Sequence, residues 1–267
     1  IEVSPEWITI VAVDETSLDW LQSWPISDEK VAELLNKINF YKPRAIGLGI
    51  YRNLPIEPGS KKLKKVIESM PSLTGIELLL DNQKTRVGVQ SLLSEEGKIG
   101  LNTIIVDADG KVRRGLLYAN NNHGKPLESF ALKLAKTYLK SEEIEPKNAG
   151  NSDYLQLGKA IFTRFEKYDG GYINTDNGGY QFLSNFPKPI CKKYCGEKSY
   201  GFRTVSVKEV FNGKNGNVYE ELFKDRIVLI GSTAPSLQDL KLTPYSSTFM
   251  SKQVEPISGI ELQAYFI

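Results

Sequence analysis

The feature that most constrains the fold is a short apolar run, Ile227 to Gly231, within FKDRIVLIGSTAPSLQDLKLTP. Charged residues precede the run and small polar residues follow it. A continuous, β-branched run of this length indicates a strand buried on both faces, as in a mostly parallel sheet. Ser232 and Thr233 follow at its carboxyl end, the edge where open α/β sheets usually bind ligands. Their hydroxyls face such a crevice, or small residues here simply let the chain turn closely against the sheet.

A second apolar strand is predicted for WITIVAVDE, residues 7 to 15. In a parallel sheet its terminal Asp14 and Glu15 lie at the same edge as Ser232 and Thr233, so we expect them to be neighbours. Alternatively, Asp14 is the N-cap of a short helical turn. A carboxylate cluster of Asp14 and Glu15 with Asp239 is the weaker, catalytic interpretation of these residues.

The chain alternates strands and helices, which predicts an α/β fold with a mostly parallel or mixed central sheet and helices on both faces. Residues 98–119 are predicted to form an antiparallel hairpin around DADG. Residues 141–201 are irregular, and we expect them to be an insertion into a single domain, residues 1–267. Further strands are predicted at 45–51 and 73–80, and helices at 28–41, 60–70, 126–140, 206–211 and from Ser258 onward.

The composition excludes several functions. The 34 basic and 32 acidic residues give a net charge of +2, so no global field indicates a nucleic-acid partner. The sequence contains no P-loop, G-x-S-x-G or H-E-x-x-H motif. Its one histidine, His123, lies in the polar loop NNNHGK and is a poor general base. We therefore expect no familiar catalytic centre and no cofactor.

Cys191 and Cys195 are the only two cysteines, in PICKKYCGEKSYG. Two thiolates with no nearby histidine do not make a structural zinc site, so no metal is expected. In an oxidising compartment the pair would close a small loop as a disulfide, and free thiols are the alternative. No apolar run reaches the roughly 18 residues that a membrane span needs.

Five segments of the chain, taken in order, are informative together: ITIVAVDETSLDWLQSWPIS, RAIGLGIYRNLP, DADGKVRRGLL, LFKDRIVLIGSTAPSLQDLKLTP and ISGIELQA. In this order they resemble the second type of CHASE domain, the extracellular sensory domains associated with bacterial cyclases and histidine kinases. The similarity spans nearly the whole chain.

The resemblance implies an extracytoplasmic (periplasmic) domain of a cytoplasmic-membrane protein, with one transmembrane helix before it and several after it. Its parent would carry a signalling module on the other side, and the similarity is to cyanobacterial members. Three positions differ from the pattern of the family. Gly49 stands where the family typically has an acidic residue, Asn53 where Asp is frequent, and Gln263 where a histidine is common. The matching positions are expected to line a pocket: Asp14, Trp24, Arg113, Arg114, Ser232, Thr233, Asp239 and Thr243.

Alternation along the returning arm of the predicted hairpin puts Arg113 and Arg114 on opposite faces, so at most one of them faces any given site. Surface ion pairs are the alternative role for both.

Two functions follow as expectations. In the first, a small ligand or protein signal binds at the carboxyl edge of the sheet and shifts the C-terminal helix, which relays to the transmembrane helices of the parent chain. In the second, the domain senses nothing and acts as a structural module that forms a homodimer.

Overall fold

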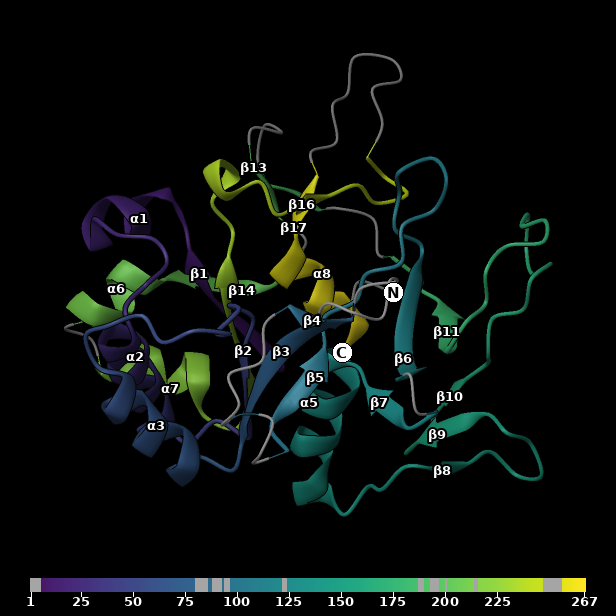
Figure 1. Ribbon diagram of the computed structural model, residues 1–267, viewed down its shortest axis with the longest axis horizontal. Coiled ribbons are helices and arrows are strands. Elements are labelled where there is room, and N and C mark those ends of the chain that lie inside the picture. The colour runs from purple at the N-terminus through teal and green to yellow at the C-terminus, as the bar shows by residue number, and fades with distance from the viewer. Residues whose placement is uncertain are drawn as a thin grey trace.

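A computed structural model describes residues 6–79, 86–87, 93, 97–121, 124–186, 190–192, 197–199, 201–213, 216–246 and 256–267. Its centre is a sheet of six parallel strands in the order β14, β1, β15, β2, β3, β5, with a short antiparallel strand, β4, also paired to β3 (Figure 1). The predicted fold class is therefore confirmed. The strands are β1 (Ile8–Val13), β2 (Ala45–Leu48), β3 (Leu73–Leu79), β4 (Arg86–Val87), β5 (Ile99–Leu101), β14 (Arg203–Ser206) and β15 (Ile227–Ser232).

The apolar run Ile227 to Gly231 lies in β15, between β1 and β2 in the middle of the sheet. Its residues Ile227 to Gly231 are all buried, as expected for a strand covered on both faces. Val13 pairs with Ser232 in the parallel register of β1 and β15. Asp14 and Ser232 therefore reach the same carboxyl edge, as predicted.

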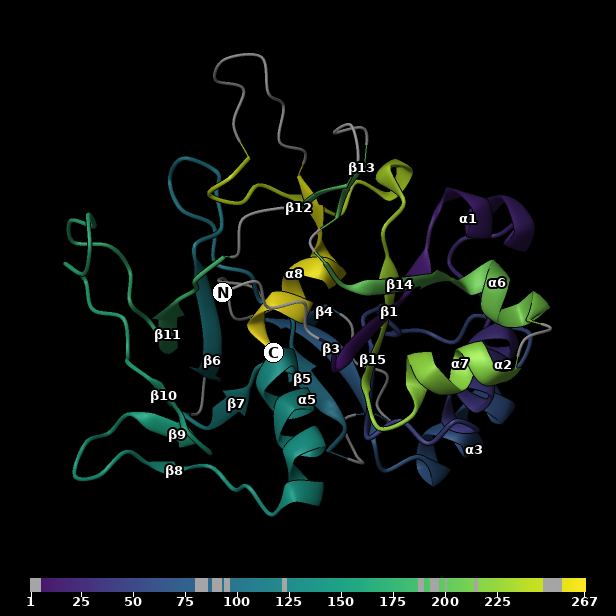
Figure 2. The ribbon, with the colours of Figure 1, turned by 180° about the vertical axis from the view of Figure 1, so that it is seen from behind.

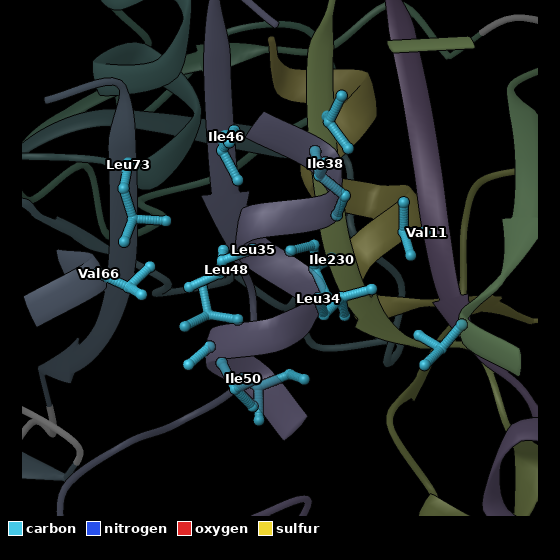
Figure 3. Packing of buried hydrophobic residues seen from close by; sticks show 14 of the residues in the cluster. Val11, Leu34, Leu35, Ile38, Ile46, Leu48, Ile50, Val66, Leu73 and Ile230 are labelled. Carbon is cyan, nitrogen blue, oxygen red and sulfur yellow. The ribbon is translucent and has the colours of Figure 1, made fainter. Parts of the chain in front are cut away.

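One face of the sheet is covered by a layer of helices that connect parallel strands. Side chains of alternate strand residues, such as Val11, Ile46 and Ile230, pack with Leu34 and Leu35 into a continuous core (Figure 3). This layer holds α1 (Glu15–Leu21), α2 (Asp28–Asn39), α3 (Ser60–Ser69), α6 (Val207–Asn212) and α7 (Gly216–Phe223). Helix α7 was not predicted.

Two helices, α5 (Phe130–Leu139) and α8 (Gly259–Phe266), cover the opposite face (Figure 2). They pack on the other set of alternate strand residues, including Ile8, Ile10 and Leu229. Helix α5 is shorter than the predicted 126–140, because residues 126–128 form β7 (Pro126–Glu128) and Ser129 caps the helix through the Leu132 N–H. Ser258 caps α8 in a capping box with Glu261, as the sequence indicated for Ser258.

The predicted hairpin over residues 98–119 is only partly formed. Its first arm is β5, which pairs in parallel with β3 instead. Gly100 of this strand lies against the start of α5, where a Cβ atom would fall 2.5 Å from Phe130 Cα. The turn itself is present, since the Asp107 N–H donates to the Lys111 carbonyl at 2.9 Å. The returning arm is β6 (Arg114–Asn120), which forms its antiparallel hairpin with β7.

The remaining strands form small antiparallel sheets beside the central one (Figure 1). Strand β6 also pairs with β11, while β8, β9 and β10 form a separate sheet in the irregular segment. That residues 141–201 are an insertion into a single domain stays a prediction. The short elements are η1 (Lys140–Glu142), β8 (Lys147–Asn148), β9 (Leu155–Leu157), β10 (Ala160–Phe162), β11 (Tyr180–Leu183), β12 (Ile190–Lys192), β13 (Glu197–Ser199), η2 (Pro235–Leu237), β16 (Leu240–Lys241) and β17 (Ile257–Ser258).

Candidate functional site

A pocket of about 880 Å³ opens at the carboxyl edge of the central sheet. Its wall and floor come from the ends of strands β15, β2, β3 and β5, and from the loops that follow them. The volume is that of a small-molecule site, which typically spans about 300–1,000 Å³. The carboxyl-edge pocket, as we call it, is lined by Trp24, Pro25, Gly49, Ile50, Tyr51, Asn53, Leu54, Pro55, Ile56, Leu78, Asn102, Ile104, Val106, Ser232, Leu237, Gln238, Asp239 and Lys241.

One wall of this pocket, residues 51–56, is anchored to the start of α2 by a buried ion pair. Arg52 Nη1 lies 3.2 Å from Asp28 Oδ1, and both side chains are almost fully buried. The second carboxylate oxygen of Asp28 accepts from the Ile56 N–H at 3.2 Å, and the Asp28 N–H donates to the Ile56 carbonyl. Burial raises the pKa of Asp28, against the lowering by the Ile56 N–H and Arg52. The loop is thus fixed by its buried side, which leaves Asn53 and Leu54 exposed at the pocket.

Beneath the pocket the sheet lies in close contact with the first turn of α8. A Cβ atom added to Gly49 would fall 2.6 Å from Ile260 Cδ1, and one added to Gly231 would fall 2.7 Å from Ile260 Cβ. Only glycine leaves room for Ile260 at this distance. Asp239, another lining residue, accepts the Gly259 N–H at its backbone carbonyl, at 2.9 Å. Pocket residues therefore contact the start of α8 directly.

A chain of hydrogen bonds also links the pocket to the second turn of α8. Gln263 Nε2 donates to Asn102 Oδ1 at 2.8 Å, and Asn102 Nδ2 donates to Tyr51 Oη at 3.1 Å. Gln263 is buried, whereas Tyr51 and Asn102 are half-buried and line the pocket. Burial raises the pKa of Tyr51, so its hydroxyl stays protonated. A ligand that displaces Tyr51 or Asn102 would disturb the partner of Gln263.

Three predicted site residues line the pocket: Trp24, Ser232 and Asp239. Ser232 Oγ is buried and has no hydrogen-bond partner among the described residues. Asp239 Oδ1 lies 2.7 Å from Lys241 Nζ, so these two lining charges neutralise each other. Whether any of the three contacts a ligand stays a prediction.

Asp14, Glu15 and Thr233 share this edge but do not line the pocket among its described residues. Asp14 Oδ1 is the N-cap of α1 and accepts from the Ser17 N–H at 2.8 Å, as well as from three hydroxyls. Burial raises the pKa of Asp14, but the hydrogen bonds from Ser17, Ser206 and Thr16 outweigh it and hold that pKa below its usual value. Glu15 accepts from Ser236, and Thr233 donates its backbone N–H to the Val13 carbonyl. The alternative N-cap role of Asp14 is therefore the one that its contacts support.

Arg113 and Arg114 both belong to a different cluster, centred on Asp107, so the expectation that at most one of them faces a given site is wrong. Arg114 is buried, pairs with Asp107 Oδ1 at 2.8 Å, and its guanidinium contacts the rings of both Phe165 and Tyr172. Arg113 bridges Asp107 and Asp109. Burial raises the pKa of Asp107, but the hydrogen bonds from Arg113, Tyr172 and Arg114 outweigh this effect. They hold the pKa of Asp107 below its usual value. These contacts tie the 107–111 turn to the irregular segment, and a ligand role for either arginine stays a prediction.

Thr243 is buried, and its backbone N–H donates to Ser246 Oγ at 3.0 Å. Its own Oγ1 accepts from the Tyr245 N–H at 3.2 Å. Thr243 thus shapes the turn after β16, and its predicted contact with a ligand stays untested.

The sequence reasoning missed Tyr51, Asn102, Leu54 and Val106 as pocket residues. Tyr51 and Leu54 belong to YRNLP, which follows a predicted strand, so the same edge rule could have found them. Asn102 was missed because residues 98–119 were predicted to form an antiparallel hairpin. The first arm of that hairpin is instead the parallel strand β5, and Asn102 follows it at the carboxyl edge.

The sequence also raised the questions of a disulfide, a metal site and membrane-spanning helices. Cys191 lies in β12, but Cys195 and His123 fall outside the described residues, so the disulfide stays a prediction. Within the described ranges, no cluster of three or more His, Cys, Asp or Glu side chains is arranged to hold a metal ion. No helix in that part of the chain is long and apolar enough to cross a membrane.

The fold is an α/β domain with a pocket at the carboxyl edge of its central sheet. The family model of the CHASE2 domain matches residues 1–267, and the chain belongs to this family of extracellular sensory domains. The resemblance read from the sequence is thereby confirmed. No curated protein and no solved structure matched the chain in the same comparisons.

Proposed function

We propose that this domain receives a chemical signal on the periplasmic side of the cytoplasmic membrane, as part of a membrane-anchored signalling protein. A small molecule binds in the carboxyl-edge pocket, and α8 carries the response toward transmembrane helices of the parent chain. The observation that carries the proposal is that Gly49, which lines the pocket, lies against Ile260 of α8, as does Gly231 on the neighbouring strand β15. The domain performs no catalysis in this role.

The relay requires a ligand that prefers one position of α8 over another, since equal binding to both would shift nothing. Two contacts supply such a difference. Ile260 fills the space over the two glycines, and Gln263 depends on Asn102 for its hydrogen bond. Any displacement of the pocket floor changes the packing or the polar partner of α8.

Hydrogen exchange on the purified 267-residue chain tests the proposal. Fractionated small-molecule extracts are added, and fractions that raise the melting temperature are then examined for exchange at α8 amides. We expect at least one fraction to stabilise the domain, because a ligand that binds only the folded state does so by mass action. The same fraction should change exchange in α8.

Asn53→Trp provides the matched variant, because Asn53 is exposed at the pocket and a larger side chain there fills the opening. Asn39→Trp, at the exposed end of α2, is the control for adding a tryptophan. The proposal requires that Asn53→Trp alone abolishes the thermal shift. Stabilisation without any change in α8 exchange would contradict the relay. Self-association of the domain stays a prediction, which sedimentation velocity checks directly.

A further inference from the structure

The charges that line the carboxyl-edge pocket are balanced within the described residues. Asp239 and Lys241 are the charged lining residues there, and they pair at 2.7 Å. The other polar side chains, such as Asn53, Asn102 and Gln238, are neutral. An ion that enters the pocket loses water without gaining an unpaired opposite charge, which is costly. This lining favours an uncharged molecule.

Ser232 gives the pocket an unused hydrogen-bonding group. Its Oγ is buried and lacks a partner among the described residues, in a structure where nearby Tyr51 and Asn102 are bonded to each other. Buried polar atoms are normally paired, and an exception needs an explanation. Ser232 lines the pocket, so a rotation about its χ1 would bring Oγ to the pocket surface, where a ligand hydroxyl or amide would satisfy it.

The opening of the pocket is apolar. Trp24 is 41% exposed, Leu54 is 67% exposed and Val106 is 52% exposed, and all three line the pocket. They come from separate loops, after α1, β2 and β5 respectively. Exposed large apolar side chains gathered around one cavity mark a binding surface rather than isolated exposure. They would cover the apolar body of a ligand whose polar group reaches Ser232.

We propose that the carboxyl-edge pocket binds an uncharged molecule that has a hydroxyl or amide group and an apolar body. Its polar group hydrogen-bonds with Ser232 Oγ, and its apolar body packs on Trp24, Leu54 and Val106. The proposal rests on the proposed function, because it names the ligand class of the same pocket.

Three matched probes test the charge preference: benzamide, benzoate and benzylamine, which share a ring and differ in charge. Each is titrated at millimolar concentration into the purified 267-residue chain, and binding is followed by protein-observed NMR. Fragments this small bind weakly even in good sites, so NMR is the suitable method. We expect benzamide to shift signals of the pocket and to bind more tightly than either ion.

Ser232→Ala and Thr103→Val separate the role of Ser232 from effects on folding. Thr103 Oγ1 is the other hydroxyl in the described residues that is buried without a partner, but Thr103 does not line the pocket. Neither variant loses a hydrogen bond, so both should keep or raise the melting temperature. Ser232→Ala should weaken benzamide binding by about 3- to 10-fold, the effect of one net hydrogen bond, and Thr103→Val should leave it unchanged.

Tighter binding of benzoate or benzylamine, or no binding of benzamide, would overturn the proposal. So would equal benzamide binding by wild type and Ser232→Ala. These results are distinct from a failure of the proposed function. Binding of benzamide without any effect on α8 exchange contradicts the relay alone, whereas an extract fraction that acts through α8 but contains a charged ligand contradicts the ligand class alone.

Discussion

Ile260 lies directly against Gly231, so closely that a Cβ atom on Gly231 would fall 2.7 Å from Ile260 Cβ. This contact joins the end of the central strand β15 to the first turn of the terminal helix α8. The next residue of β15, Ser232, lines the pocket. The end of this strand therefore contacts the start of α8 and borders the pocket.

Gly231→Ala should destabilise the domain by about 1–3 kcal/mol, because the added methyl group overpacks the contact with Ile260. Urea unfolding followed by circular dichroism measures this loss. In an Ile260→Gly background, Gly231→Ala should cost less free energy than it does in the wild type, because Ile260→Gly removes the Cβ, Cγ1 and Cδ1 atoms that the added methyl group meets. If the two substitutions were simply additive, the contact between these residues would not be the cause.

Gln263→Leu should loosen α8 by removing the donor to Asn102 Oδ1. We expect a loss of about 1–3 kcal/mol in the free energy of unfolding, because Asn102 keeps a polar oxygen without its partner. Hydrogen exchange at α8 amides should become faster. Tyr51→Phe removes the other end of the same chain, and a double-mutant cycle should show coupling between the two positions. Independent effects would mean that the chain does not act as a unit.

Arg114→Met should cost about 3 kcal/mol of stability, because it removes one partner of a buried ion pair and both ring contacts. Arg113→Met is the matched control. Its side chain is 33% exposed, so the expected loss is about 1 kcal/mol or less. Chemical denaturation of the two variants measures the difference. A ligand-binding defect in Arg114→Met with wild-type stability would instead assign this arginine to a binding site.

Asp14→Asn should make the domain less sensitive to acid. The pKa of Asp14 is held below its usual value of 3.8 in the folded state, so its charged form contributes stability above about pH 4. That contribution is lost as the pH falls through the lowered folded pKa. Asparagine keeps the N-cap but does not titrate.

Unfolding free energies at pH 7 and pH 3 should therefore differ less in Asp14→Asn than in the wild type. Asp19→Asn, which changes an exposed carboxylate of the same helix, controls for net charge. The folded-state pKa of Asp107 is also lowered. The pH dependence of the unfolding free energy should therefore be reduced in Asp14→Asn but not abolished. An unchanged difference between the two pH values would contradict the role of Asp14.

Much of the fold was predictable because its signals are local. The apolar runs that became β1, β2, β3 and β15 have the length and composition of buried strands, and Ser27 and Ser258 are ordinary N-caps. Helix α7 was missed because its sequence lies among glycine and asparagine residues. Its stability comes from rings brought by distant elements, such as Tyr41 against Phe223.

The candidate site, like the fold, could be predicted only where its signals are local in the sequence. The edge rule for parallel strands correctly placed Asp14 and Ser232 at one end of the sheet, because β1 and β15 run in the same direction and end together. It did not tell which polar side chain faces the pocket and which turns back to the backbone. Asp14 caps α1 because Ser17 and Ser206 offer hydrogen bonds, and Ser206 comes from a strand 192 residues later in the chain.

By itself, the sequence determined the α/β layers, the family and the edge at which polar residues gather, since strand periodicity, caps and motif order are all encoded within short segments. Only the tertiary structure decided that β5 joins the parallel sheet and brings Asn102 to the pocket, that Arg113 and Arg114 serve a separate cluster, and that α8 packs beneath the pocket. The physical reason is that these outcomes depend on packing and hydrogen bonds between residues far apart in the chain, whose partners no local pattern specifies.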